Sequence, residues 1–370
     1  MEFPRAQAAV APADYLGDLA TRLEARARSC SNRDPDAPAR LVFGPAALDA
    51  QALERLPRIR GAELRREEHG LARLTVVPAR LKAEAKENGG LRCLSAAIDA
   101  ALAAPPPPIV MGILNVTPDS FSDGGRFLET DQAIEHGRAL VAAGADWIDV
   151  GGESTRPGAE PVALEAELER IVPVVRALAA DGRCVISIDT TKAEVARAAL
   201  AAGATVVNDV SAGRNDPALL PLVADRGAGL VLMHAQGSPS DMQRDPRYGD
   251  VVREVTAHLR ARARAAWQAG VAPERIALDP GFGFGKRLED NLALLDALPE
   301  LRSLGFPLCV GVSRKSFLGR LSGEGEPARR LSETLAATAL AAAAGAVIHR
   351  VHEVGPVRAA LAIAGALPCR

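Results

Sequence analysis

The stretch CVISIDTTKAEVARAALAAGATVVNDVSA, residues 184–212, holds one repeat of a pattern that runs through most of the chain. Two apolar runs rich in Val and Ile, 184–190 and 205–211, flank a segment that has helical periodicity and ends in Ala-Gly. Strands buried on both faces have continuous apolar sequences, and a strand-helix-strand order requires the two strands to be parallel. The stretch therefore predicts a βαβ unit.

Six further apolar runs of strand length lie on either side of this unit. Together with the first two, the runs are 109–116, 147–152, 184–190, 205–211, 230–234, 275–280, 307–313 and 346–352. Eight βα units in roughly 260 residues match a (β/α)8 TIM barrel, and a doubly wound open sheet is the alternative. The barrel is favoured because a regular eighth unit ends the chain with little left over.

Four consecutive prolines at 105–108 divide the chain into two regions, because a proline run is extended and non-helical. Residues 105–370 hold the predicted barrel, whereas residues 1–104 are predicted to form a small α+β region of unknown role. The predicted strands of that region are 39–44, 63–67 and 72–81, and the possible helices are 46–56 and 93–103.

The composition indicates a globular protein and argues against nucleic-acid and membrane partners. Of the 370 residues, 48% are hydrophobic, 24% charged and 3% aromatic, and the formal net charge is −2. A basic run and aromatic stacking surface are both lacking, and the longest apolar run, 335–348, is too short to span a bilayer. Five cysteines without C-x-x-C spacing predict neither a disulfide framework nor a zinc site. The first residues lack the pattern of a signal peptide, so we expect a cytoplasmic protein.

Polar residues interrupt the apolar runs near their carboxyl ends. They are Asn115, Glu153, Asp189, Asn208, Asp209, His234, Asp279, Ser313, Arg314, Lys315, Arg350 and His352. In a (β/α)8 barrel these ends meet at one mouth, where the catalytic residues of such enzymes lie. A capping or loop role is the commoner explanation for any single residue. Eight strands that end alike nevertheless predict one shared site.

The side chains at the predicted mouth favour an anionic substrate that contains nitrogen. Arg156, in the loop GGESTRPGA, can bind an anion with its guanidinium fork, and Lys315 and Arg350 add positive charge. Asp189 and Asp279 are flanked by apolar residues, so they should be partly buried and accept hydrogen bonds from N–H donors.

Together with Asn208, these carboxylates suit the edge of a nitrogen heterocycle. A metal-carboxylate cluster is the alternative, but the histidines are isolated in the sequence and lack metal-ligand spacing. Mg²⁺ held by Asn115 and by diphosphate oxygens fits better, because Mg²⁺ is usually bound through substrate phosphates and few protein ligands.

The stretch LDPGFGFGK, residues 278–286, differs from a nucleotide-binding loop. A P-loop has four residues between its first glycine and the GK pair, followed by Ser or Thr. Here three residues separate Gly281 from Gly285, and Arg287 follows the lysine. Lys286 is predicted to be a loop or surface charge outside the chemistry.

The order and spacing of eight segments resemble those of the dihydropteroate synthases. The segments are MGILNVTPDSFSDGG, DVGGESTRPGA, SIDTTK, NDVSA, LMHAQG, LDPGFGFGK, VGVSRKSFLG and RVHEV. The resemblance covers about residues 108–367. It implies a homodimeric enzyme of folate biosynthesis that condenses 6-hydroxymethyl-7,8-dihydropterin diphosphate with 4-aminobenzoate, giving 7,8-dihydropteroate and pyrophosphate.

The resemblance also implies roles for individual residues. The pterin ring would be held by Asp189, Asn208, Asp279 and Lys315, with Arg350 lining that pocket. The diphosphate and its Mg²⁺ would be met by Arg350, His352 and Asn115. The loop residues Thr155 and Arg156 would contact the diphosphate or the aminobenzoate. The aminobenzoate pocket, in which sulfonamides compete, would be bordered by Phe284, Pro157 and Ser313.

The implied mechanism needs no protein nucleophile. Departure of pyrophosphate from the pterin methylene leaves a cation that the ring delocalises, and the aniline nitrogen then attacks it. Arg156, Arg350 and His352, together with Mg²⁺, would stabilise the departing charge. The buried Asp189 would favour the positive ring.

Two substitutions depart from the family pattern: Glu353 stands where Asp is usual, and Ala235 where Met is common. Two other functions remain as alternatives. A methyl-tetrahydrofolate-binding barrel of a corrinoid methyltransferase would not require NVTPDSFSDGG or SRKSF. A non-catalytic pterin-binding subunit should have lost residues of the site, yet every matched position holds a competent residue.

Overall fold

The computed structural model describes residues 107–117, 126–154, 162–237, 242–302 and 304–366, together with the backbone of three strands that precede them. The chain divides into two compact units. The first contains a three-stranded antiparallel sheet, and the second contains the barrel.

The sheet of the N-terminal unit has the strand order β1-β3-β2. Its strands are β1 (Ala39–Phe43), β2 (Ala62–Arg66) and β3 (Ala72–Val76). Strand β3 pairs antiparallel with both neighbours, so the three strands predicted in this region are confirmed. The helices predicted at 46–56 and 93–103 lie outside the described residues, and the boundary between residues 104 and 105 stays a prediction.

The second unit contains eight parallel strands in the order β10-β11-β4-β5-β6-β7-β8-β9. They are β4 (Ile109–Asn115), β5 (Trp147–Gly151), β6 (Val185–Asp189), β7 (Val206–Asp209), β8 (Gly229–Met233), β9 (Ile276–Asp279), β10 (Cys309–Val310) and β11 (Ile348–Val351). A parallel bridge between Leu278 and Leu308 joins the two ends of this order and closes the ring. The predicted TIM barrel is confirmed, and the open sheet is excluded.

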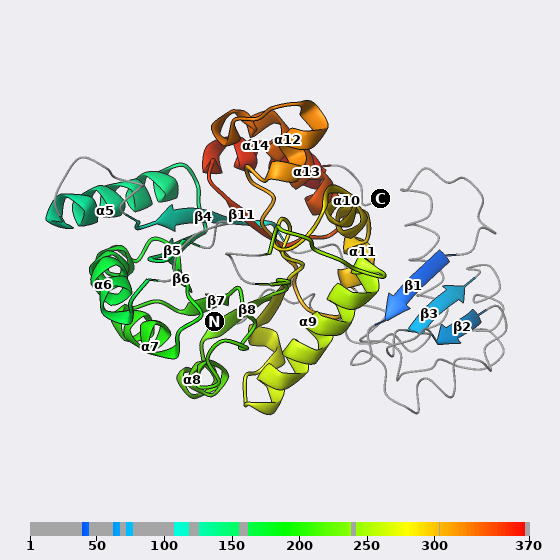
Figure 1. Cartoon of the computed structure of the whole chain (residues 1–370), viewed down its shortest axis with the longest axis horizontal. Helices are drawn as coiled ribbons and strands as arrows, with labels where there is room; N and C mark the ends of the chain where they lie inside the picture. Colours follow the sequence, from blue (N-terminus) through cyan, green and yellow to red (C-terminus); the bar gives the residue numbers. More distant parts are fainter. Residues whose placement is uncertain are drawn as a thin grey trace, which may run out of the picture. The chain divides into compact units, whose positions relative to one another are not determined.

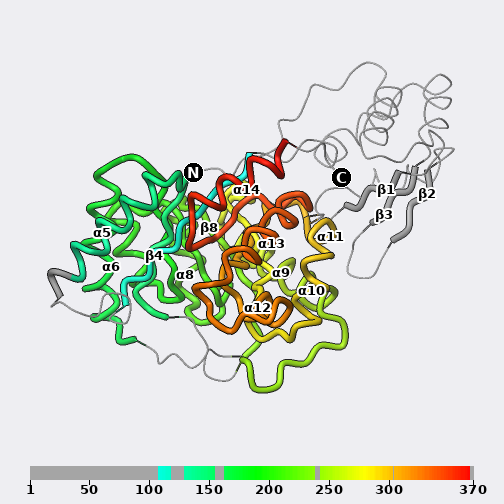
Figure 2. Tube along the Cα trace, turned by 90° about the horizontal axis from the view of Figure 1, so that it is seen from above, coloured from blue at the N-terminus to red at the C-terminus, as the bar shows by residue number. Residues whose placement is uncertain are grey.

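The helices of the described barrel follow its strands in sequence and lie outside them (Figure 1). They are α5 (Arg126–Ala142), α6 (Leu164–Asp181), α7 (Ala193–Ala202), α8 (Leu219–Arg226), α9 (Val251–Gln268), α10 (Leu288–Asp296), α11 (Leu298–Arg302), α12 (Ser316–Ser322), α13 (Leu331–Ala343) and α14 (Val354–Ala366). Figures 1 and 2 both place α5 and α6 on the opposite side of the barrel from α10. None of the helices in the described part of the chain has the length and apolar character that a bilayer-crossing segment needs.

The Ala-Gly step after α7 allows this helix to end and to pack closely on α6. Gly203 has a φ of +117°, which side chains disfavour, and its backbone N–H donates to the carbonyl of Leu200 at 3.3 Å. A Cβ at Gly203 would lie 2.5 Å from the Cβ of Ala179 on α6. Any larger residue would therefore push the two helices apart.

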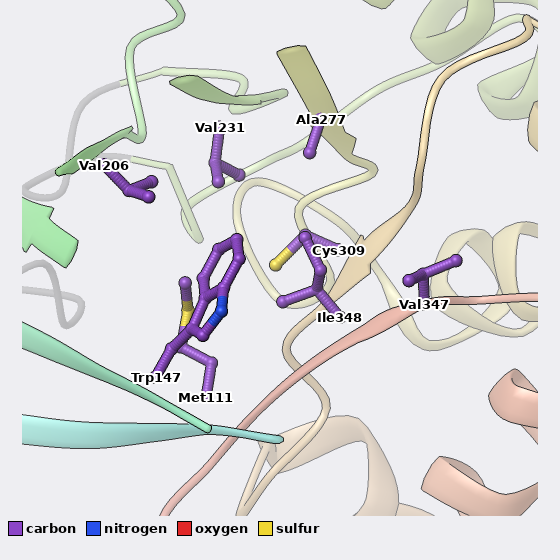
Figure 3. Packing of buried hydrophobic residues seen from close by; sticks show 8 residues of the cluster. All are labelled: Met111, Trp147, Val206, Val231, Ala277, Cys309, Val347 and Ile348. Carbon is purple, nitrogen blue, oxygen red and sulfur yellow. The ribbon is translucent and has the colours of Figure 1, made fainter. Parts of the chain in front are cut away.

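The floor of the barrel is an apolar cluster to which most of the strands contribute. It consists of Met111, Trp147, Val206, Val231, Ala277, Cys309, Val347 and Ile348 (Figure 3). All eight residues are buried, and the Trp147 indole lies in the middle of the group in Figure 3. The cluster fills the interior with side chains, as in other TIM barrels, so this end of the barrel is packed.

The interior changes from apolar to polar only two residues further along the strands. Side chains alternate between the two faces of a strand, so residues two apart share a face. Asp149 follows Trp147, Asp279 follows Ala277, and the same step leads from Ile348 to Arg350. The next layer toward the carboxyl ends is therefore charged.

Burial of His349, on β11, predicts acid sensitivity of the fold. The residue is completely buried, and burial lowers the pKa of its imidazole to about 4. Below pH 6.5 the unfolded chain binds a proton at this imidazole, whereas the folded chain does not until about pH 4. Each pH unit lost in that window should therefore remove about 1.4 kcal/mol of unfolding free energy.

The variant His349→Leu isolates this contribution from those of other groups. We expect the wild-type unfolding free energy in urea, minus that of the variant, to be constant above pH 7 and to fall between pH 6.5 and pH 4. A difference that stays constant from pH 8 to pH 4 would show that His349 is not held neutral.

Candidate active site

Four neighbouring strands end in one row of residues at the barrel mouth. The register pairs Asn115 with Gly151 and Gly151 with Asp189. The next pair joins Asp189 to Asn208. Gly151 has no side chain, so it leaves a gap in this row between Asn115 and Asp189. A Cβ at Gly151 would lie 3.5 Å from the Cβ of Asp189 and 3.8 Å from Oδ1 of Asn115. The amide of Asn115 and the carboxylate of Asp189 thus face a shared space.

The guanidinium group of Arg350 joins two carboxylates beneath this row. Its Nε donates to Oδ2 of Asp149 at 2.6 Å, and its Nη2 donates to Oδ2 of Asp189 at 2.7 Å. Asn208 Nδ2 donates to the same Oδ2 of Asp149 at 3.0 Å. The residues come from β11, β5, β6 and β7, so the barrel alone brings them together.

The second oxygen of each carboxylate is left available as an acceptor. Within the described residues, no group donates to Oδ1 of Asp149 or to Oδ1 of Asp189, and both atoms are buried. Burial raises the pKa of Asp189, although the Arg350 guanidinium opposes this, and the Asp149 carboxylate adds to the rise. Two unused acceptors beside a single cation suit a ligand that brings N–H donors or positive charge.

Asp279 lies at the start of the glycine-rich loop that follows β9. It is buried, its Oδ1 accepts from the backbone N–H of Gly281 at 2.7 Å, and burial raises its pKa. Phe282 packs into the core against Phe317, with ring centroids 6.1 Å apart. This aromatic contact ties the loop to the helix α12 beside it.

The other phenylalanine of the loop lies under a predicted site residue. The ammonium of Lys315 lies 4.0 Å from the centroid of the Phe284 ring, a cation-π contact. A Cβ at Gly283 would lie 3.0 Å from Cδ of Lys315, so the absence of a side chain admits the lysine stem. The predicted pterin residue Lys315 and the predicted aminobenzoate residue Phe284 are therefore in contact.

Lys286 lies in a loop, as one half of its prediction has it, but the other half, a surface charge, is wrong. Its side chain is only 3% exposed, and its ammonium contacts backbone carbonyls of its own loop and the ring of His234. Burial lowers the pKa of Lys286 to about 7. Spacing along the sequence gave no sign that the side chain turns back into the loop.

Ser313 and His352 are also brought together at the mouth. Ser313 Oγ and His352 Nδ1 are 2.9 Å apart, and the backbone N–H of His352 donates to the same hydroxyl at 3.2 Å. Glu353, the departure from the family pattern, pairs with Arg314, whose Nε donates to its Oε1 at 2.6 Å. The longer acid is thus held by an arginine of the facing loop.

A lysine fastens the two ends of the loop GGESTRPGA. Nζ of Lys192 donates to Glu153 Oε2 at 2.5 Å, to the carbonyl of Val162 at 2.7 Å and to the buried Glu167 at 2.6 Å. Glu153 precedes the loop centre and Val162 follows it. The predicted site residues between them lie outside the described residues: Thr155, Arg156 and Pro157.

The described residues contain no group of three or more His, Cys, Asp or Glu side chains that could hold a metal ion. The sequence predicted Asn115 as an oxygen ligand of Mg²⁺, and its amide faces the space over Gly151. Such a donor fits a cation bound mainly through substrate oxygens.

The chain matches the family of pterin binding enzymes over residues 111–352. A dihydropteroate synthase of Mycobacterium leprae is 52% identical over 263 residues, which are 70% of this chain and 92% of that protein. A dihydropteroate synthase of Synechocystis sp. is 49% identical over 258 residues, 70% of this chain and 89% of that protein. The chain belongs to the dihydropteroate synthases.

Solved dihydropteroate synthases share the barrel. The Xanthomonas albilineans enzyme with 4-aminobenzoic acid has a TM-score of 0.66 and 48% identity, covering 70% of this chain and 92% of that one. The same enzyme in complex with 7,8-dihydropteroate has a TM-score of 0.63 and 45% identity, with the same coverage. The family resemblance found in the sequence is confirmed.

The described structure places most of the predicted site residues of this dihydropteroate synthase at the barrel mouth. They are Asn115, Asp189, Asn208, Asp279, Phe284, Ser313, Lys315, Arg350 and His352. Their individual roles toward substrates stay predictions. Sequence reasoning missed Asp149, although a lone acid inside the apolar run WIDVGG is a signal that could have identified it.

Removal of the Asp149 charge should destabilise the protein markedly. In Asp149→Asn, Arg350, whose side chain is 19% exposed, keeps one carboxylate of its two. The lost acid is fully buried, and breaking a buried ion pair costs about 3–5 kcal/mol. We expect a loss of about 3 kcal/mol in the free energy of unfolding by urea.

Glu194→Gln is the matched control, because it makes the same change in the exposed pair with Arg197. It should cost less than about 1 kcal/mol. Equal, small losses in the two variants would mean that the Arg350 pairing contributes no more than a surface ion pair.

Proposed function

We propose that this chain condenses 6-hydroxymethyl-7,8-dihydropterin diphosphate with 4-aminobenzoate to form 7,8-dihydropteroate and pyrophosphate, as a transferase of folate biosynthesis. The pair of buried, unused carboxylate oxygens on Asp149 and Asp189 carries the proposal, because it offers acceptors to a planar ring rich in N–H groups. The Xanthomonas albilineans relative was solved in complex with 7,8-dihydropteroate, whose pterin ring is of this kind.

The pterin would lie across the row at the barrel mouth. Asp189 and Asp279 would accept from N–H groups at its ring edge, and the Asn208 amide could accept or donate there, as the family resemblance implies. Lys315 would lie beside the same ring, held in place by Phe284. Asp149, Asp189 and Asp279 outnumber the two cations beside them, Arg350 and Lys315. The pocket would therefore favour a ring on which positive charge develops.

The reaction would proceed by loss of pyrophosphate and capture of the cation. The bond between the pterin methylene carbon and the diphosphate oxygen breaks, and both electrons leave with pyrophosphate. The aniline nitrogen of 4-aminobenzoate then forms the new bond and gives up a proton. Arg156, Arg350 and His352 would stabilise the departing negative charge.

Mg²⁺ fits the site through Asn115, whose amide oxygen faces the gap over Gly151. When bound, the ion would neutralise charge on the diphosphate. The protein residues would orient the two substrates, and no side chain is required as a nucleophile.

The aminobenzoate would enter beside the pterin methylene. Phe284 and Ser313 would border its pocket together with Pro157, and sulfonamides would compete for it.

The homodimer and the cytoplasmic location stay predictions of the sequence. The role of residues 1–104 stays undefined.

The first test is a product assay with purified protein, Mg²⁺ and the pterin diphosphate. We expect 7,8-dihydropteroate and pyrophosphate to appear in equal amounts, and only when 4-aminobenzoate is added. Pyrophosphate release without any dihydropteroate would refute the proposal. Methyl transfer from methyl-tetrahydrofolate would support the corrinoid alternative instead.

The division of roles is tested by three alanine variants titrated with the pterin diphosphate. Asp189→Ala and Lys315→Ala should abolish measurable pterin binding, because each removes a group at the ring. Arg156→Ala should keep pterin affinity and lower kcat about 100-fold, since it acts on the departing charge. Equal loss of pterin affinity in all three variants would show that the roles are assigned wrongly.

A further inference from the structure

Lys286 ends the motif LDPGFGFGK, and its buried side chain turns back into the loop that the motif forms. Its ammonium donates to the carbonyl of Gly281 at 2.8 Å and to the carbonyl of Phe284 at 3.1 Å. It also lies 3.3 Å from the carbonyl of His234 and 3.0 Å from Nδ1 of the same residue. One ammonium thus joins the loop after β9 to the end of β8.

The ring of His234 has to accept from this ammonium. Burial lowers the pKa of His234, and the neighbouring Lys286 charge lowers it further. A neutral imidazole with Nδ1 as acceptor carries its proton on Nε2. His258 meets the ring edge-on, with centroids 4.8 Å apart. While Lys286 is protonated, the contact therefore favours a neutral His234 with its proton on Nε2.

The ammonium has no carboxylate as a direct partner among the described residues. The two nearest acids are engaged elsewhere: Asp279 accepts from Gly281, and Asp290 pairs with Arg287. Both acids raise the pKa of Lys286, whereas burial lowers it more strongly. Burying a cation against carbonyls is costly unless every donor is used. The contacts of the buried ammonium offset this cost only in part, and their effect is to hold the loop in one conformation.

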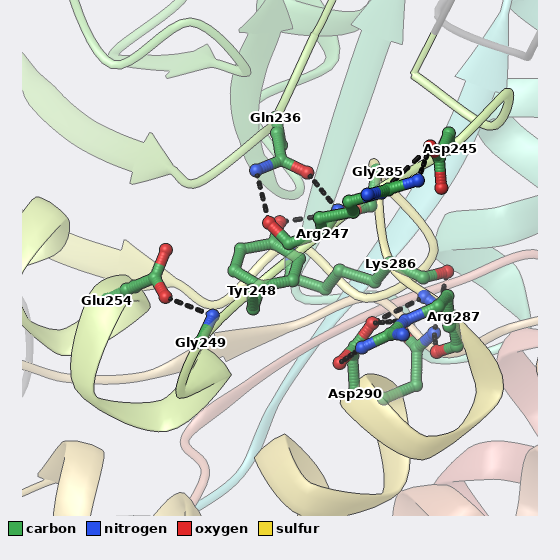
Figure 4. Close-up of polar contacts among 11 residues, drawn as sticks. Gln236, Asp245, Arg247, Tyr248, Gly249, Glu254, Gly285, Lys286, Arg287 and Asp290 are labelled. Carbon is green, nitrogen blue, oxygen red and sulfur yellow. Dashed lines mark hydrogen bonds and ion pairs between the residues drawn. The ribbon is translucent and has the colours of Figure 1, made fainter.

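The segment that follows β8 also constrains the conformation of this loop. A Cβ at Gly281 would lie 1.9 Å from the carbonyl oxygen of His234, and a Cβ at Gly285 would lie 2.3 Å from that of Gln236. The hydroxyl of Tyr248 donates to the carbonyl of Gly285 at 2.7 Å (Figure 4). The glycines let the loop lie directly on the segment after β8.

The residue fixed by these contacts is Phe284. Its carbonyl is bound by Lys286, its N–H donates to the carbonyl of Gly281 at 3.1 Å, and its ring lies under the ammonium of Lys315. A shift of the Phe284 backbone would move this ring. It would also change the place of Lys315.

We propose that Lys286 is a positioning residue for the aminobenzoate pocket, acting through the backbone of Phe284. This proposal rests on the proposed function. The ammonium clamps the carbonyls of Gly281 and Phe284 to His234, and so holds the Phe284 ring as a wall beside the place where the aniline nitrogen attacks. Lys286 itself touches neither substrate.

The test replaces the ammonium with an apolar group of similar length. In Lys286→Met we expect the KM for 4-aminobenzoate to rise about tenfold, the effect of losing charge-assisted hydrogen bonds. The affinity for the pterin diphosphate, measured by calorimetric titration without aminobenzoate, should stay within about twofold of wild type. This split distinguishes positioning of one pocket from general loss of structure.

Arg287→Met is the matched control at the next residue. Arg287 is half-exposed and pairs with Asp290, away from the loop carbonyls (Figure 4). Both constants should be unchanged in this variant. Tyr248→Phe removes only the hydroxyl bond to Gly285 and should raise the KM for 4-aminobenzoate by a smaller factor.

A Lys286→Met protein with an unchanged KM for 4-aminobenzoate, or with equal losses for both substrates, would overturn the proposal. If Lys286→Met does not fold, Tyr248→Phe decides: a raised KM supports the proposal and an unchanged KM overturns it. Wild-type protein that makes no dihydropteroate would instead overturn the proposed function itself.

Discussion

The guanidinium group of Arg350 is the interaction on which the site depends. It binds one oxygen of Asp149 and one of Asp189, at 2.6 and 2.7 Å. Desolvation makes two buried acids expensive, and a planar cation with several donors can satisfy both at once. Because each acid uses its Oδ2 in this bridge, its Oδ1 accepts from no donor among the described residues. The same contact therefore joins three strands of the barrel and leaves two acceptors beside the candidate site.

The barrel makes this contact possible by changing the character of its interior over a short distance. The Trp147 layer is packed and apolar, and the charged layer begins at Asp149, two residues later on the same strand. The apolar floor lowers the local dielectric beneath the acids, which strengthens their pairing with Arg350 and raises the pKa of Asp189. Above them, the loop closed by Lys286 holds Phe284 and Lys315. The apolar floor thus lies beneath the layer that holds the predicted site residues.

Much of this arrangement could be predicted from the sequence, because it depends on the periodicity of the apolar residues and on the order of the strands and helices. The eight apolar runs gave the strands, and the polar residues at their ends gave the mouth. Asp149 was missed because one acid inside an apolar run has the same local signal whether it faces the core or the site. Lys286 was predicted as a loop or surface charge, and its burial was missed because a turn that folds a side chain back depends on contacts with the segment after β8, which spacing does not encode. Pairings such as Ser313 with His352 depend on distant strands in the same way.

If the proposed function holds, Arg350 and Asp149 should act as one unit in presenting acceptors to the pterin. The most direct measurement is a double-mutant cycle with Arg350→Met, Asp149→Asn and the combined variant, each titrated with the pterin diphosphate. We predict that the losses of binding free energy in the two single variants are far from additive, with a coupling energy of about 1.5 kcal/mol or more. Losses that add to within about 0.5 kcal/mol would contradict it, because the two side chains would then act independently.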